Sequence, residues 1–154
     1  MLLFRRYSLV LWFGLIFTFF SSAVMAQDSG WSAYKSRFLM TDGRIIDTAN
    51  KNVSHTEGQG FSMLLAVFND DQATFDKLWQ WANTTLYRKD IGLYSWRYDP
   101  NSTPHVADTN NASDGDTLMA WALLLAGDKW NDSRYTKASI NLRAARWSTR
   151  GTSA

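Results

Sequence analysis

The feature that most constrains the fold of this chain is a pair of long apolar segments, each of which follows a polar stretch that carries carboxylates. Residues 58–68 read GQGFSMLLAVF and are apolar nearly all round, which predicts a buried helix. The glycines lower helix propensity, but they allow another backbone to pack closely near the helix start. The later stretch SDGDTLMAWALLLAG predicts a second buried helix from about Asp116 to Ala126, with Gly127 as its natural stop.

Three further segments have the spacing of amphipathic helices. Trp31, Tyr34 and Phe38 indicate a short helix, and residues 75–86 place their apolar side chains on one helical face. Residues 135–142 form a third such face, preceded by Asp132 or Ser133 as the N-cap. Because no segment shows a clear strand pattern, the predicted fold class is all-α, built from helical hairpins.

Two segments depart from this helical pattern. Residues 87–111 hold both prolines of the chain and predict a long functional loop, or a loop with a short hairpin. After Leu142, the sequence RAARWSTRGTSA loses its apolar periodicity. Residues 143–154 are therefore predicted to form an irregular tail.

The first 26 residues have the order of a secretory signal. Arg5 and Arg6 precede an apolar stretch over residues 9–20, and the small-residue sequence VMA ends at Ala26. The apolar stretch is shorter than the roughly 20 residues of a membrane-spanning helix. We therefore predict a signal peptide at residues 1–26 that is cleaved near Ala26, and a mature protein in the periplasm or outside the cell. An uncleaved anchor is the alternative.

Composition excludes several classes of function. The net charge is only +2 and the basic residues are scattered, so nucleic acid is not a predicted partner. There is no cysteine, which excludes disulfides and thiolate metal sites. A calcium loop counted from Asp108 fails, because Ser113 and Met119 occupy the positions of the required glycine and glutamate. With only two histidines in the chain, no metal site is predicted.

Carboxylates stand at the start of both buried helices, and they have two interpretations. Glu57 precedes the first helix, and Asp114 and Asp116 precede the second. An aspartate is a good N-cap, so capping explains Asp114 or Asp116, whereas a glutamate caps poorly. The chemical interpretation is a pair of carboxylates in an aromatic-rich secreted domain, which suits glycoside hydrolysis. The abundance of aromatic residues, 15% of the chain, fits either a core or a surface that stacks on sugar rings.

Specific motifs then resemble the family-8 glycoside hydrolases. The segment ASDGDTLMAWALLLAGDKW, residues 112–130, fills every constrained place of that family's signature. SHTEGQGFSM at residues 54–63 is similar to the segment that carries the family's general acid, and DGRIID and SWRYDP also resemble family segments. The resemblance covers roughly residues 30–140 and is strongest to the endoglucanases, or cellulases, that accompany bacterial cellulose synthesis.

This resemblance implies a fold, a reaction and two roles. The fold is an (α/α)6 barrel, of which residues 27–142 would form the N-terminal portion. The reaction is inverting hydrolysis of β-1,4-glucan chains, with no metal or other cofactor. Glu57 matches the proton donor, and Asp114 matches the acid often named the family's nucleophile. Since inversion forms no covalent intermediate, we expect Asp114 to hold the sugar or to orient water instead.

Six further residues are expected at or near the substrate. Trp96, Tyr94 and Tyr98 lie in the long loop and suit sugar stacking, although Tyr94 fits a core position equally well. Arg97 and Asn111 have the chemistry to hydrogen-bond either sugar hydroxyls or the acids. Asp116 is interpreted mainly as a helix cap, with a direct role in substrate binding as the second interpretation. All six lie between residues 94 and 116.

Two functions stay open from the sequence. The first is an active endo-β-1,4-glucanase that acts on β-1,4-glucan and is functionally associated with the cellulose synthase machinery. The second is a C-terminally truncated, non-catalytic fragment that binds glucan weakly or does not fold independently. The catalytic base is expected beyond this chain, because the last acidic residue is Asp132. We therefore expect that this chain alone is not catalytically competent.

Overall fold

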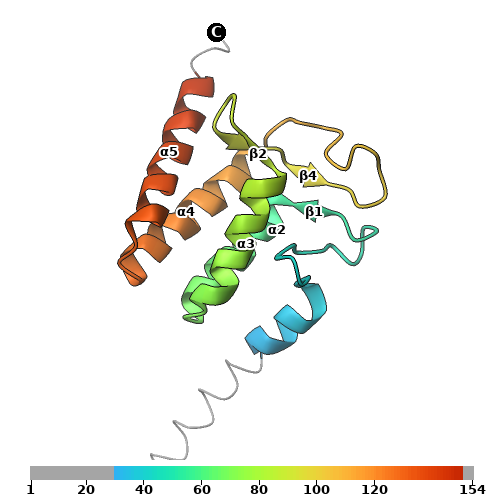
Figure 1. Ribbon diagram of the computed structural model, residues 1–154, viewed down its shortest axis with the longest axis horizontal. Coiled ribbons are helices and arrows are strands. Elements are labelled where there is room, and N and C mark those ends of the chain that lie inside the picture. The colour runs from blue at the N-terminus through green and yellow to red at the C-terminus, as the bar shows by residue number, and fades with distance from the viewer. Residues whose placement is uncertain (1–29, 151–154) are drawn as a thin grey trace, which may run out of the picture. The chain divides into compact units, whose positions relative to one another are not determined.

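The computed structural model describes residues 30–150, which are predominantly helical (Figure 1). Residues 30–38 are helical, as the spacing of Trp31, Tyr34 and Phe38 predicts, and the Trp31 and Tyr34 rings stack at 5.7 Å. The longer helices are α2 (Thr56–Phe68), α3 (Gln72–Thr85), α4 (Ser113–Lys129) and α5 (Ser133–Arg150). The strands are β1 (Ser54–His55), β2 (Tyr87–Arg88), β3 (Leu93–Tyr94) and β4 (Arg97–Tyr98).

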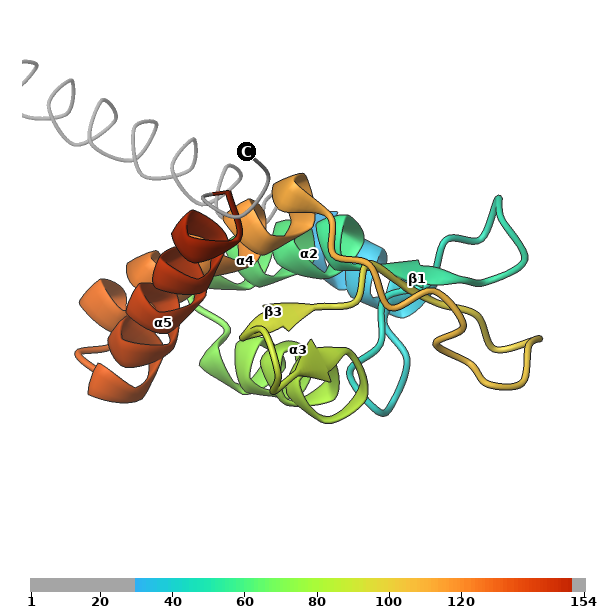
Figure 2. The ribbon, with the colours of Figure 1, turned by 90° about the horizontal axis from the view of Figure 1, so that it is seen from above.

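The four longer helices form two antiparallel hairpins, α2–α3 and α4–α5, and the hairpins meet through α2 and α4 (Figure 2). The buried helices predicted from the two apolar segments are α2 and α4, and the amphipathic ones are α3 and α5. Tyr135 of α5 lies between the hairpins and is fully buried. Its ring meets Phe75 of α3 at 5.0 Å, and its hydroxyl donates to Asp76 at 2.7 Å.

Two glycines set the closeness and the direction of the α2–α4 contact. A Cβ added at Gly60 of α2 would lie 2.7 Å from the Cβ of Leu118 in α4. A Cβ added at Gly115 of α4 would lie 2.6 Å from the Cβ of Thr56 in α2. Neither position has room for a side chain. The prediction that the glycines near the start of the first buried helix let another backbone approach is confirmed for Gly60, whereas a Cβ at Gly58 would meet only Ile45 at 3.8 Å. Because the starts of both helices touch, α2 and α4 run parallel and begin at the same end.

A buried glutamine fixes the start of α2 against the preceding loop. The Gln59 amide nitrogen donates to the carbonyls of Gly43 at 2.7 Å and Leu78 at 2.9 Å. Its amide oxygen accepts from the backbone N–H of Ile45 at 3.1 Å. These three hydrogen bonds satisfy the buried amide group of Gln59. They tie the segment after Thr56 to the preceding loop and to α3.

Short strands connect the segments that precede the buried helices. β1 pairs with β4 in antiparallel register, with His55 opposite Arg97, and β2 pairs with β3. Isolated bridges extend this pairing, including one between Ser95 and Asn111. Residues 87–111 therefore contain the short hairpin that was one of the two interpretations of this loop. The strands were not predicted, because two residues are too few to show an alternating pattern.

The expected stop at Gly127 is wrong. Helix α4 continues to Lys129, and the residue with a left-handed backbone is Asn131, with a φ of 50°. Gly127 has a different purpose: a Cβ there would lie 2.3 Å from the Thr136 hydroxyl of α5. The glycine permits the close α4–α5 contact. At the start of α5, Asp132 accepts from the backbone N–H of Arg134, which confirms Asp132 as a cap.

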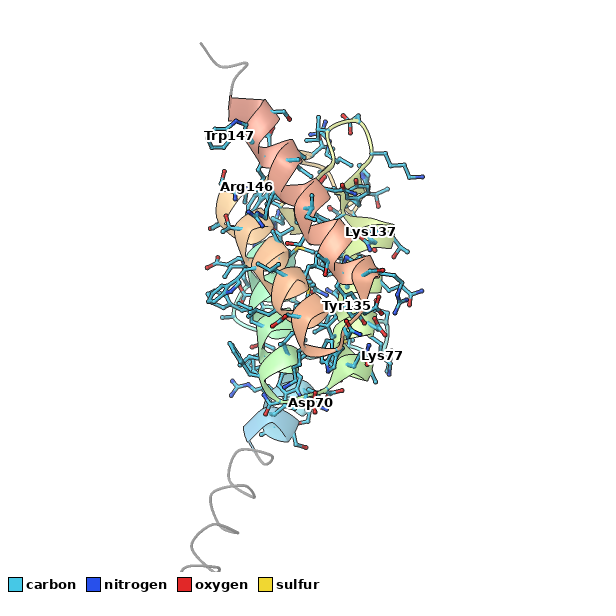
Figure 3. All side chains as sticks on the ribbon, turned by 90° about the vertical axis from the view of Figure 1, so that its left-hand side faces the viewer. Asp70, Lys77, Tyr135, Lys137, Arg146 and Trp147 are labelled. Carbon is cyan, nitrogen blue, oxygen red and sulfur yellow. The ribbon has the colours of Figure 1, made fainter. Side chains whose placement is uncertain are left out.

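The expected irregular tail is also wrong as far as Arg150. Helix α5 runs from Ser133 to Arg150, and Figure 3 shows it unbroken from Tyr135 to Trp147. Leu142 is buried, and Ala145 packs beside Gly92 of the β2–β3 turn. The helical face thus continues through a small residue that the apolar pattern did not reveal, and alanine and arginine both favour a helix.

The predicted signal peptide lies outside the described residues. In the part of the chain that the structure covers, no helix has the length and apolar character needed to cross a membrane.

Candidate active site

Glu57 and Asp114 lie together at the end where α2 and α4 begin. Glu57 is in the first turn of α2, and Asp114 is in the first turn of α4. Gly115, the neighbour of Asp114, lies so close to α2 that its added Cβ would be 3.1 Å from the backbone nitrogen of Glu57. Both carboxylates are exposed to solvent. The glycine contact is thus the reason that two acids 57 positions apart in the sequence share one surface.

A shallow depression of about 230 Å³ opens between the two acids. We call it the Glu57 depression. Its lining comes from β1, from the starts of α2 and α4, and from one loop residue: His55, Thr56, Glu57, Trp96, Ala112 and Asp114. Three of the predicted site residues, Glu57, Asp114 and Trp96, are therefore brought together in the described structure.

The capping interpretation of the carboxylates does not hold. The N-cap residues are His55 for α2 and Ala112 for α4, and neither makes a capping hydrogen bond with its side chain. One Asp114 oxygen accepts from the backbone N–H of the adjacent Gly115 at 2.8 Å. Glu57 and Asp114 thus stand inside the first turns and line the depression, and the bond from Gly115 to Asp114 is the one bond to a helix-end N–H described for them.

Main-chain bonds hold Trp96 between the two acid-bearing segments. Its carbonyl accepts from the Thr56 N–H at 3.0 Å, and its own N–H donates to the Asn110 carbonyl at 2.8 Å. The indole ring stacks on His55 at 5.5 Å, and the indole N–H donates to Asp108 at 2.8 Å. The backbone N–H of Asn110 and the Trp96 indole together hold the pKa of Asp108 below its ordinary value. An ionised Asp108 is the stronger acceptor for the indole.

Asp116 is neither a cap nor a surface residue. Its side chain is fully buried, so it does not reach a sugar in this structure. One oxygen accepts from the Tyr94 N–H at 3.2 Å, and the other accepts from the Asn111 amide at 2.9 Å. Asn111 therefore hydrogen-bonds an acid, which was one of its two expected partners. Burial raises the pKa of Asp116, against the opposing effect of these two hydrogen bonds.

The raised pKa of Asp116 predicts how stability depends on pH. An aspartate ionises at about 3.9 in an unfolded chain. Between that pH and the higher pKa of the folded state, the folded chain keeps the proton on Asp116 while the unfolded chain loses it, so the free energy of unfolding declines as pH rises through this window, and the contribution is lost above the folded pKa. Asp116→Asn should remove that decline, because asparagine does not titrate. Urea unfolding at several pH values measures it.

The matched control for this pH prediction is Asp128→Asn, since Asp128 is exposed on the same helix. The charges of Arg146 and Asp114 act on Asp116 in opposite directions, and both remain in the two variants. If the difference between wild type and Asp116→Asn stays constant with pH, the raised pKa of Asp116 is wrong.

The other predicted substrate residues do not line the Glu57 depression. Tyr94 is in the core, where its hydroxyl donates to Asn83 at 2.5 Å, so its core interpretation is the correct one. Tyr98 packs edge-on against Trp81 at 5.6 Å. Arg97 forms an ion pair with Asp99 at 2.9 Å. Tyr98 and Arg97 are half-buried, and neither lines the depression.

Two residues of the site were missed in the sequence. His55 lines the depression and stacks on Trp96, a role that was not predicted from the sequence. Asp108 orients the indole of Trp96. The position of His55, two residues before Glu57, was a usable signal, whereas nothing in the sequence linked Asp108 with Trp96. Within residues 30–150 no three acidic or histidine side chains gather as metal ligands would.

Comparison with known proteins gives the family of the chain. The profile of glycosyl hydrolases family 8 matches residues 5–149 of the chain. The chain belongs to glycosyl hydrolases family 8. Its described helices are the N-terminal part of the (α/α)6 barrel of this family, as the motif resemblance implied.

Individual family-8 relatives give the extent of the match. An endoglucanase of Cellulomonas uda is 60% identical over 117 residues, which are 76% of this chain and 33% of that protein. The structure of endoglucanase Cel10 from Klebsiella pneumoniae is 62% identical with a TM-score of 0.75, over 76% of this chain and 38% of Cel10. Endo-β-1,4-glucanase CMCax from Acetobacter xylinum is 38% identical with a TM-score of 0.72, over 76% of this chain and 37% of CMCax.

The chain spans about a third of the length of the curated family-8 relatives it matches. The family match over residues 5–149 contains both acids of the Glu57 depression. The remaining two thirds of those relatives have no counterpart among the described residues.

Proposed function

We propose that this chain supplies the acid-bearing part of an endo-β-1,4-glucanase site that hydrolyses cellulose-type glucans with inversion. The observation that carries the proposal is the Glu57 depression, in which two exposed carboxylates and an indole ring meet at the start of two parallel helices. Glycoside hydrolysis needs a pair of carboxyl groups on either side of the bond that breaks. Relatives that bear the name endoglucanase support the same substrate class.

Each lining group has a distinct task in this mechanism. Glu57, in its protonated form, gives its proton to the oxygen of the leaving sugar as the glycosidic bond breaks. Asp114, across the depression, hydrogen-bonds a sugar hydroxyl or orients the attacking water. The Trp96 ring offers a flat apolar face for one sugar. The carboxylate that deprotonates the water belongs to a part of the catalytic domain outside these helices.

A second candidate is a fragment that binds glucan weakly, or does not fold independently, without hydrolysing it. Exposed apolar side chains on α2 and α4, the two helices predicted to be buried, favour this candidate. Phe61 and Phe68 of α2 are 49% and 58% exposed, and Trp121 of α4 is 50% exposed. Such side chains are usually covered by neighbouring elements. In a whole barrel, further helices are the elements that would cover them.

The two candidates are separated by a comparison of this chain with a hybrid. In the hybrid, the matched region is followed by the rest of the Cellulomonas uda endoglucanase. We expect the hybrid to release reducing sugar from carboxymethyl cellulose and the chain alone to release little, because the proposal places the base outside these helices. A folded hybrid without activity would contradict the endoglucanase proposal. Equal rates for both proteins would show that no base outside this chain is required.

Export and a link to cellulose synthesis complete the proposal. The charged start, short apolar stretch and VMA sequence support cleavage after Ala26, so periplasmic or secreted material should begin at Gln27. N-terminal sequencing measures this, and mature protein that retains Arg5 and Arg6 would contradict it. The functional association with a cellulose synthase machinery rests on the likeness of the sequence motifs, and co-purification with the synthase would test it.

A further inference from the structure

Helix capping does not explain why Asp116 is a buried carboxylate. It lies in the first turn of α4, two residues after Asp114, and is 0% exposed. Burying a carboxylate is unfavourable unless its oxygens are hydrogen-bonded. Both oxygens of Asp116 are bonded, one to the Tyr94 N–H and the other to the Asn111 amide. The two donors therefore indicate what the buried group is for.

Both donors belong to the backbone segments that hold Trp96. Tyr94 is two residues before Trp96 on the same segment. Asn111 follows Asn110, whose carbonyl accepts the Trp96 N–H at 2.8 Å. Ser95, the neighbour of Tyr94, pairs with Asn111 in an antiparallel bridge. Asp116 thus bonds to both sides of the paired backbone on which Trp96 is mounted.

The geometry points to Asp116 as a positioning residue that ties the Trp96 segment to the start of α4 and so sets the indole ring relative to Asp114 and Glu57. Its significance for catalysis rests on the proposed function, whereas its geometry stands on the hydrogen bonds alone. An apolar residue would fill the same space but would leave the buried Tyr94 N–H and the half-buried Asn111 amide without this acceptor. The need to accept two hydrogen bonds explains why a carboxylate stands at a position that is fully buried.

A purely structural role predicts something different. If Asp116 only stabilised the fold, its loss would lower stability in the way that losing any buried hydrogen bond does. Ser139 provides that comparison, because its hydroxyl donates to the Ala120 carbonyl in the buried α4–α5 contact at 2.7 Å. Ser139→Ala removes one buried bond from α4 without touching the Trp96 segment.

The test follows two N–H groups by NMR, the indole N–H of Trp96 and the backbone N–H of Tyr94, in the purified chain that begins at Gln27. The indole resonance of Trp96 is identified by its loss in Trp96→Phe. In Asp116→Ala we expect this resonance to shift or broaden, and the Tyr94 amide to exchange with solvent roughly 5- to 100-fold faster, because its acceptor is gone. Asn111→Ala removes only one of the two bonds and should shift the Trp96 indole while the fold survives.

The conservative variant Asp116→Asn should rescue both signals. Its amide oxygen accepts from Tyr94, and its nitrogen donates to Asn111 once the Asn111 amide turns over. Ser139→Ala should leave the Trp96 indole in place. The inference is overturned if the shift of the Trp96 indole and the exchange rate of the Tyr94 amide change by the same amount in all three variants, Asn111→Ala, Asp116→Ala and Ser139→Ala. If Asp116→Ala does not fold, an unshifted indole in Asn111→Ala overturns it.

These measurements need no substrate, so they separate the inference from the proposed function. An inactive hybrid would contradict the endoglucanase proposal, while the NMR signals would still decide whether Asp116 positions Trp96.

Discussion

Replacing Glu57 with glutamine should lower hydrolysis of unactivated glucan by at least about a hundredfold in a protein that contains the whole catalytic domain. Glutamine keeps the shape of the side chain but has no proton to give to the leaving oxygen. A general acid typically contributes about 10²- to 10⁴-fold to the rate. Because Glu57 is exposed and takes no part in capping α2, the fold should survive the change. Reducing-sugar release and a thermal melt measure the two effects.

An activated substrate sharpens this prediction. An aryl cellobioside with an acidic phenol needs little protonation as it leaves, so Glu57→Gln should lose much less activity on it than on glucan. Asp128→Asn on the exposed side of α4 is the control, with an unchanged rate on both substrates. Near-normal turnover of glucan by Glu57→Gln would refute the role of this residue as the proton donor.

Replacing Gly115 with alanine should separate the two acid-bearing helices. The new Cβ would lie 2.0 Å from the Thr56 hydroxyl and 2.6 Å from the Thr56 Cβ. Thr56 is buried and its Cβ is fixed to the backbone, so the helix starts must move apart. Overpacking of this kind costs typically about 1–3 kcal/mol, and occasionally more. Urea unfolding should show that loss, and hydrolysis by the whole domain should fall with it.

Gly58→Ala is the matched control for this change, since it adds the same methyl group to the first turn of α2 but outside the contact with α4. A Cβ at Gly58 meets only Ile45 at 3.8 Å, an ordinary contact distance. Alanine also favours a helix over glycine by up to about 1 kcal/mol. We therefore expect Gly58→Ala to be neutral or stabilising. Equal stability of Gly115→Ala and Gly58→Ala would contradict the close contact of the α2 and α4 starts.

The helices were predictable from the sequence because their apolar residues recur with helical spacing. The buried helix expected at residues 58–68 is α2, and the one expected at 116–126 lies within α4. The errors come from glycine and alanine, whose small size hides their contacts. Gly127 resembled a helix stop but admits Thr136, and Ala145 resembled a tail residue but packs against Gly92.

The site was predictable where chemistry and motif coincide, and unpredictable where it depends on backbone pairing. Glu57, Asp114 and Trp96 were expected, and the structure places them in one depression. Asp116 was expected as a cap because an aspartate at a helix start usually is one. Its burial depends on Tyr94 and Asn111, which reach it only through the short strands. No local pattern in the sequence records those contacts.

The main chain of Trp96, and not its side chain, bonds the two acid-bearing segments. Its position comes from the backbone bonds to Thr56 and Asn110, which any residue except proline can make. The side chain at position 96 is therefore interchangeable without disturbing the main chain on which it is mounted. Exchanging the ring for another aromatic or a polar side chain would change the surface that the proposed function assigns to a sugar, while leaving Glu57 and Asp114 in place. Evolution or design can thus vary the side chain at this position independently of the acids.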